Sequence, residues 1–95
     1  MSYELQFLPS ALKEWRKLGF TVREQFKAKL AERLQAPHVP ADRLAGSEMK
    51  DCYKIKLRAS GYRLVYRVSD AAITVTVVAV GKRDRQAVYR TAQKR

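Results

Sequence analysis

The chain has 95 residues, 46% of them hydrophobic, and its 20 Lys and Arg residues against nine Asp and Glu give a net charge of +11. This length predicts one small domain over residues 1–95 with a single modest core. No apolar run approaches the ~20 residues that span a bilayer, and no signal peptide is visible, so we expect a cytoplasmic protein with no membrane partner. One Cys and one His exclude an internal disulfide and make a metal cluster unexpected.

The positive charge is concentrated in the second half of the chain. From Cys52 onward there are eleven basic and two acidic residues, whereas the preceding residues include nine basic and seven acidic. A basic segment with interleaved tyrosines is typical of a surface that binds nucleic acid. Two alternatives stay open at this point: a solvated surface that only maintains solubility, and a surface that binds an acidic protein.

The first part of the chain predicts a strand followed by two helices. Residues 2–8 alternate as in a strand. Ser10 is expected to cap the first helix, which Gly19 ends. The sequence Thr-Val-Arg-Glu at 21–24 is expected to form a capping box for the second helix, which Pro37 ends. Apolar residues at helical spacing predict that each helix buries one face, and Trp15 is expected in the core.

Residues 38–51 predict a loop, because Pro40 and Gly46 interrupt any regular pattern. A loop of this length in a small domain is often functional. The single histidine, His38, lies between two prolines and is expected to be a surface residue without a catalytic role.

Residues 52–67 predict a hairpin with one apolar and one cationic face, because successive side chains in a strand point to opposite sides. The cationic face collects Lys54, Lys56, Arg58 and Arg63. A two-residue turn at Ser60-Gly61 would place Arg58 opposite Arg63. Like charges that face each other destabilise a hairpin. We therefore expect a polyanionic ligand on this face.

The β-branched run at 73–80 predicts a central strand, since apolar residues lie on both of its faces. Gly81 is expected to end this strand and to let the chain turn. Residues 84–94 predict a short helix capped by Asp84. The expected fold is α+β, in the order β-α-α-β-β-β-α: a mostly antiparallel sheet with an N-terminal helical hairpin packed on one face and a short C-terminal helix.

A second group of cations follows the predicted central strand. Lys82, Arg83 and Arg85 lie at its end, and Tyr89 is within two helical turns of them. Arg binds phosphate oxygens as a bidentate fork and can stabilise the charge of a pentacoordinate phosphate. Tyr can stack on a base, and a Lys among other cations has a lowered pKa and can accept a proton. Phosphate binding without chemistry stays an alternative for this cluster.

Four segments resemble the RelE toxins of bacterial toxin–antitoxin modules, nearly from end to end. They are Leu12-Lys-Glu-Trp-Arg-Lys-Leu18, Cys52-Tyr-Lys-Ile-Lys-Leu-Arg58, Ser60-Gly-Tyr-Arg-Leu-Val-Tyr66 and Gly81-Lys-Arg-Asp-Arg85. The resemblance implies a RelE-like fold and a ribosome-dependent endoribonuclease. Such an enzyme enters the A site of the 70S ribosome and cuts the mRNA codon there. The 2′-hydroxyl of the mRNA is the attacking group, so the resemblance implies no metal or other cofactor.

The resemblance also implies the residues of the active site, which are Lys54, Lys56, Arg63, Arg83 and Tyr89. Lys54 and Arg63 would hold the scissile phosphate, and Arg83 would serve the leaving oxygen. Lys56 or Tyr89 would take the 2′-proton, and neither is preferred at this point. The remaining cations near the site are expected to bind nucleic acid: Arg58, Lys82 and Arg85.

The implied partner is a RelB-like antitoxin that wraps the toxin and blocks its entry into the ribosome. Operator DNA is expected to be bound only through the antitoxin complex. Two other functions stay open. A ParE-like toxin that acts on DNA gyrase shares the fold but is expected to lack the Lys, Arg and Tyr set, and a non-catalytic nucleic-acid-binding module would need the cations alone.

Overall fold

The computed structural model describes residues 2–82 and 87–95. Its helices and strands follow the predicted order: β1 (Glu4–Phe7), α1 (Pro9–Arg16), α2 (Phe20–Gln35), β2 (Cys52–Leu57), β3 (Tyr62–Ser69), β4 (Thr74–Lys82) and α3 (Ala87–Gln93). Two short 3₁₀ helices, Pro40–Asp42 and Ser47–Met49, lie between α2 and β2. None of the helices described is long and apolar enough to cross a membrane.

The four strands form one sheet in the order β1-β4-β3-β2. β1 pairs with β4 in parallel, whereas β3 runs antiparallel to both β4 and β2. β4 is therefore central, as its apolar sequence predicted. The pairing with β3 shifts after Val65, which pairs with Ala79 while Tyr66 pairs with Val77. This bulge leaves Val78 as an extra residue in β4.

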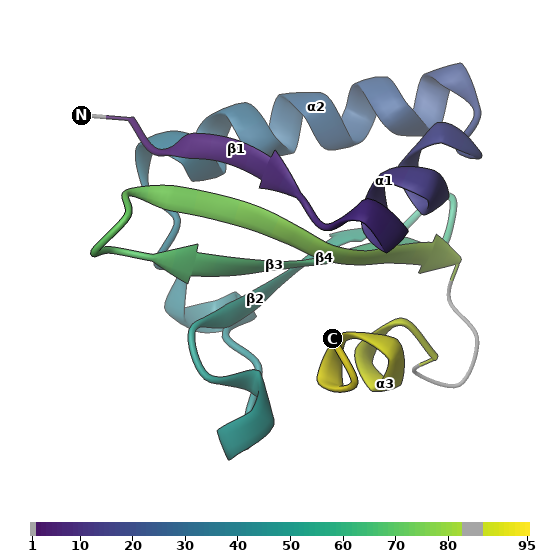
Figure 1. The fold of residues 1–95 in the computed structure, drawn as a ribbon. Coiled ribbons are helices and arrows are strands. Elements are labelled where there is room, and N and C mark those ends of the chain that lie inside the picture. The colour runs from purple at the N-terminus through teal and green to yellow at the C-terminus, as the bar shows by residue number, and fades with distance from the viewer. Residues whose placement is uncertain (1, 83–86) are drawn as a thin grey trace.

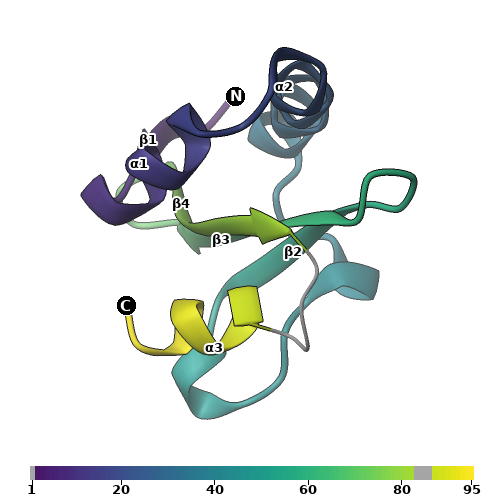
Figure 2. The same ribbon diagram turned by 90° about the vertical axis from the view of Figure 1, so that its right-hand side faces the viewer.

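The sheet separates two layers of helices (Figures 1 and 2). The α1–α2 hairpin covers one face, as predicted, and α3 covers part of the other. The larger core lies under α1 and α2, where Trp15 and Phe26 pack against side chains of all four strands. A smaller core lies under α3, where Val88 and Ala92 contact Val65 and Val78. The predicted α+β fold is confirmed.

Both helices of the hairpin begin two residues earlier than the predicted caps require. α1 begins at Pro9 and α2 at Phe20, and neither has a side-chain cap. The predictions that Ser10 caps the first helix and that residues 21–24 form a capping box were therefore wrong. Proline at the first helical position is pre-set for helix geometry. The sheet also fixes the entry to α1, because the Leu8 N–H donates to the Val77 carbonyl at 3.0 Å.

The β2–β3 turn is longer than predicted. Leu57 pairs with Tyr62, so residues 58–61 form the turn, and Lys56, not Arg58, lies opposite Arg63. Gly61 has φ 77 and its N–H donates to the Leu57 carbonyl at 2.8 Å, a conformation that glycine adopts readily. The predicted two-residue turn was wrong. The predicted faces survive, because a register shift of two residues leaves every strand side chain on the same side.

The connection from α2 to β2 is fixed by polar contacts to the sheet. His38 is exposed, as predicted, but its ring nitrogens lie 3.0 Å from the Tyr53 hydroxyl and 2.8 Å from Asp70. Met49, in the second 3₁₀ helix, is buried and joins the core under α3. The connection between α2 and β2 is therefore packed against the rest of the domain.

Candidate nucleic-acid-cleavage site

β2, at the edge of the sheet, carries the first two candidate residues. Lys54 is half-buried and Lys56 is exposed. Their register partners on β3 are Val65 and Arg63, respectively. Val65 belongs to the core under α3, so these side chains share the face on which α3 packs. The strand alternation thus gathers Lys54, Lys56 and Arg63 on one face, as the sequence predicted.

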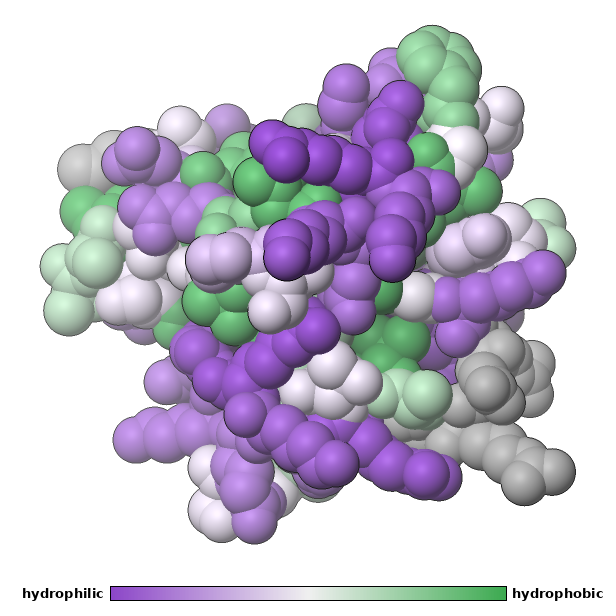
Figure 3. All heavy atoms as spheres, turned by 45° about the vertical axis from the view of Figure 1, so that its right-hand side comes forward, coloured by the Kyte–Doolittle hydropathy of each residue, from purple (hydrophilic) through white to green (hydrophobic). Residues whose placement is uncertain are grey.

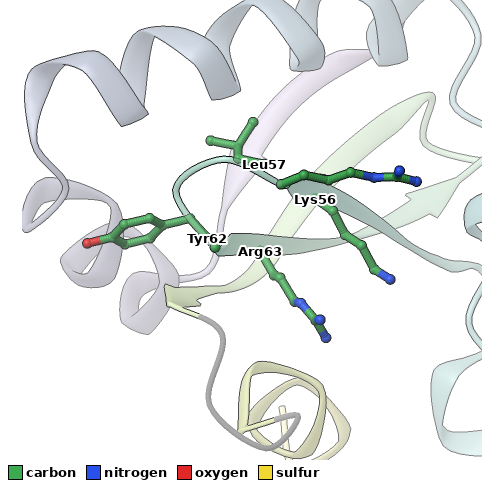
Figure 4. Close-up of a pocket in the computed structure, with 6 residues that line it drawn as sticks. Lys56, Leu57, Tyr62 and Arg63 are labelled. Atoms are coloured by element: carbon green, nitrogen blue, oxygen red, sulfur yellow. The ribbon is translucent and has the colours of Figure 1, made fainter.

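A shallow pocket of about 380 Å³ opens beside this group. The pocket is lined by Lys56, Leu57, Arg58, Gly61, Tyr62 and Arg63. Figure 4 shows that the Lys56 and Arg63 side chains point to the same side of the hairpin, toward α3, whereas Leu57 and Tyr62 point elsewhere. Two cations that converge on one open space can hold a phosphate between them.

The cluster changes the acidity of one of its members. The positive charge of Lys54 is the main cause that lowers the pKa of Lys56, and a slight loss of hydration and the charges of Arg63 and Arg58 lower it further. Each charge favours the neutral amine, because a second ammonium close by is repelled. Lys56 therefore releases its proton more easily than an isolated lysine and can accept one from a substrate hydroxyl.

Tyr89 reaches the same face from α3. The Arg63 guanidinium carbon lies over the Tyr89 ring, 5.3 Å from its centre. The Tyr89 hydroxyl is buried and has no hydrogen-bond partner among the residues described. A buried hydroxyl without a partner is costly, and such groups in native proteins call for an explanation. A ligand that reached this hydroxyl would supply the missing hydrogen bond.

The structure does not bring every predicted residue to this cluster. Arg58 lies in the turn and lines the pocket. Lys82 pairs with Tyr62, next to the Arg63–Gly81 pair, so alternation directs it to the opposite face from Arg63. Arg83 and Arg85 lie outside the described residues, as does Asp84, the predicted cap of the last helix.

Gly81 has a different role from the one predicted. It does not end the strand, because β4 continues to Lys82. A Cβ atom at this position would lie 3.0 Å from Cγ2 of Val88 on α3. The glycine thus allows α3 to pack close to the sheet, which brings Tyr89 near Arg63.

Two residues of the pocket were not singled out from the sequence. By alternation, Leu57 and Tyr62 lie on the opposite face of the hairpin from Lys56 and Arg63, yet both also border the pocket. They pair with each other and flank the turn. Their position beside a turn glycine is the signal that could have identified them, since side chains at the end of a hairpin border both faces.

Much of one face of the molecule is polar. Hydrophilic side chains cover most of the face seen in Figure 3, and hydrophobic ones show only in small areas between them. Within residues 2–82 and 87–95, no group of three or more His, Cys, Asp or Glu side chains could hold a metal ion. Cys52 shares the cationic face but is buried, and burial raises the pKa of its thiol.

The fold and the cation cluster define a small α+β protein with a cationic face. A family model for ParE toxins of type II toxin–antitoxin systems matches residues 5–87. The mRNA interferase toxin RelE of Escherichia coli K12 is 60% identical over 95 residues, which cover 100% of this chain and 98% of that protein.

Solved structures agree with these matches. The isolated RelE toxin of E. coli superposes with a TM-score of 0.84 and 58% identity, covering 98% of this chain and 97% of that one. RelE in the intact E. coli RelBE toxin–antitoxin complex gives a TM-score of 0.83 and 60% identity, covering 88% of this chain and 100% of that one. The chain belongs to the RelE-type toxins of the RelE/ParE superfamily, as its motifs indicated.

Proposed function

We propose that this chain, acting as one domain in the cytoplasm, is the toxin of a type II toxin–antitoxin module and cleaves mRNA in the ribosomal A site. The observation that carries the proposal is the gathering of Lys54, Lys56, Arg63 and Tyr89 on one face. A module that only bound nucleic acid would need the cations, but not a lysine with a lowered pKa, nor a buried tyrosine hydroxyl that has no partner within residues 2–82 and 87–95.

The proposed reaction is an attack of the mRNA 2′-oxygen on the adjacent phosphorus. Lys54 and Arg63 hold the phosphate oxygens, and neutral Lys56 takes the 2′-proton as the new P–O bond forms. The bond from phosphorus to the 5′-oxygen then breaks, this oxygen takes up a proton from water to become a 5′-hydroxyl, and the other product carries a 2′,3′-cyclic phosphate. The electron pair moves from the 2′-oxygen to the leaving oxygen, so the step needs no oxidant and no cofactor.

Lys56 is preferred over Tyr89 as the proton acceptor. The pKa of Lys56 is lowered by its neighbours, and it is exposed beside the pocket. The Tyr89 ring already lies against Arg63, which suits a role in orienting that guanidinium and stacking on a base. Arg83 is proposed to stabilise the charge on the leaving oxygen.

The proposed partners follow from charge and from the relatives. RelE of E. coli forms a complex with RelB, and a domain of net charge +11 suits an acidic antitoxin of that type. The 70S ribosome and its mRNA are the proposed targets. Operator DNA is proposed to be bound only through the antitoxin complex.

Single-turnover cleavage of mRNA on programmed ribosomes tests the function. We expect Lys56→Gln and Arg83→Ala each to slow cleavage by about 10²-fold or more, while ribosome binding stays within about twofold. Lys13→Gln removes an equal charge from an exposed position on α1 and should cleave normally.

Three outcomes would contradict the proposal. Near-normal cleavage by both site variants would reject the assigned residues, and equally fast cleavage of free mRNA would reject ribosome dependence. Inhibition of DNA gyrase without mRNA cleavage would favour the ParE-like alternative, in which gyrase is the target. This alternative is tested because the family model that matches this chain is named for ParE toxins.

A further inference from the structure

β4 extends beyond the end of its neighbour β1. The pairing with β1 stops at Phe7 and Val77, after which the chain turns into α1. β4 continues to Lys82. On the β1 side, the backbone groups that follow Val77 therefore face no strand. Val78 and Val80 are buried, so their polar backbone groups need partners other than water.

Two side chains from opposite ends of the chain supply those partners. Glu14 on α1 accepts a hydrogen bond from the Val80 N–H at 3.1 Å. Arg95, two residues after α3, donates to the Val78 carbonyl at 2.8 Å. The two side chains also bond to each other, with Nη1–Oε1 and Nη2–Oε2 distances of 2.9 and 3.1 Å.

The Glu14–Arg95 pair differs from an ordinary surface ion pair. The side chains are only 31% and 21% exposed, respectively, and their contact is bidentate. Each partner is also held by the backbone of β4. A fork-to-fork pair with further hydrogen bonds fixes geometry as well as adding energy, whereas an exposed pair contributes little.

The pair fixes the end of a weakly held helix. α3 has only seven residues, and a helix this short is not stable without tertiary contacts. Its buried side chains are Val88 and Ala92. The chain end after α3 lies below α1 in both ribbon views (Figures 1 and 2), so the pair ties α3, on one face, to α1, on the other.

Tyr89 is carried by this helix, next to Val88. Its ring lies 5.3 Å from the Arg63 guanidinium, and a small rotation of α3 would change that contact. We propose that Glu14 and Arg95 are positioning residues, which anchor the end of α3 to β4 and thereby fix Tyr89 over Arg63. The catalytic consequence rests on the proposed function, but the anchoring itself does not.

Amide hydrogen exchange on the free protein tests the anchoring. We compare the wild type with Arg95→Gln, Glu14→Gln and the matched control Lys94→Gln, which removes one charge from the exposed neighbour of Arg95. The two pair variants should exchange the amides of α3 about tenfold faster or more, while the amides of α2 stay protected. The control should match the wild type.

Cleavage kinetics test the positioning of Tyr89. Arg95→Gln should slow single-turnover cleavage by about tenfold without changing ribosome affinity, and Arg95→Lys should restore part of the rate. In a Tyr89→Ala background, Arg95→Gln should cause no further loss, because the residue through which it acts is gone. A purely structural role would instead give the same loss in both backgrounds.

Unchanged amide exchange of α3 in both pair variants would show that the pair does not hold the helix. If Arg95→Gln lowered the cleavage rate equally in the wild-type and Tyr89→Ala backgrounds, the pair would not act through Tyr89. If the wild type failed to cleave mRNA at all, the proposed function would be wrong. The hydrogen-exchange data would still test whether Glu14 and Arg95 hold the end of α3. If Arg95→Gln unfolded throughout, Glu14→Gln would replace it, since its amide oxygen can still accept from Val80.

Discussion

Lys56 shows how neighbouring strand residues can lower the pKa of a lysine that stays exposed. Lys54 lies two residues before it on the same face, and Arg63 lies opposite on β3. Repulsion by Lys54, followed by a slight loss of hydration and repulsion by Arg63 and Arg58, lowers the pKa of Lys56. The arrangement costs folding energy that a bound phosphate would recover.

Lys54→Gln should raise the pKa of Lys56, because the substitution removes the main cause of its lowering. NMR titration of ¹³C-labelled lysine in the free protein measures this pKa directly. Lys56 binds its proton more weakly in the folded protein than in the unfolded chain. Its contribution to folding stability therefore rises with pH between the pKa of Lys56 in the folded state and its pKa in the unfolded state. That rise should be smaller in the variant. A pKa that stayed constant or fell would contradict the electrostatic account, and Lys13→Gln serves as the control.

At the level of elements, the end of α2 is bound to the sheet through one arginine. Arg33 contacts Asp42 at 2.6 Å and donates to the Tyr66 hydroxyl at 2.8 Å, which in turn donates to the Pro37 carbonyl. The Tyr66 ring stacks on Tyr53, with centres 5.6 Å apart. These contacts fix α2, the following connection and the edge strand β2 against one another, and so support the strand that carries Lys54 and Lys56.

The packing of α3 against β4 yields a second test. Gly81→Ala should destabilise the fold by about 1 kcal/mol or more, because the new methyl group would lie 3.0 Å from Val88. In a Val88→Ala background the same change should cost less, since the conflicting Cγ2 atom is absent. Chemical denaturation of the four proteins measures the coupling. Equal costs in both backgrounds would show that Gly81 is needed for another reason.

Across the whole molecule, net charge is the dominant feature. A charge of +11 is confined to a body with a radius of gyration of 12.2 Å. Raising NaCl from about 20 mM to about 200 mM shortens the Debye length from about 20 Å to about 7 Å, so most of the repulsion is screened.

Two measurements should therefore respond to salt in opposite directions. The melting temperature of the free protein should rise with NaCl, because screening relieves the self-repulsion of the compact state. Affinity for RNA should fall, because the release of counterions into a more concentrated salt solution is less favourable. Inorganic phosphate at equal ionic strength should stabilise more than chloride if it occupies the cation cluster. A melting temperature that fell with NaCl would contradict this account.

The sequence predicted what short-range rules control. The faces of the β2–β3 hairpin follow from a period of two, and they survived an error in turn length. The start of α1 was predicted wrongly because a hydrogen bond from Leu8 to Val77 of the sheet fixes where the helix begins. No local sequence pattern reveals this contact. The contact of Tyr89 with Arg63 and the Glu14–Arg95 pair could not be predicted either, because both depend on where α3 packs after the sheet has formed.

The parallel pairing of β1 with β4 also sets the order in which the chain can acquire structure. It joins residues 4–7 to residues 74–77, which lie 70 positions further along the chain. Contacts of such long range slow folding, because the loop between the partners must close first. During synthesis β1 has no partner until β4 has been made, and Tyr89 follows later still. A growing chain therefore cannot assemble the site before both β4 and Tyr89 have been synthesised.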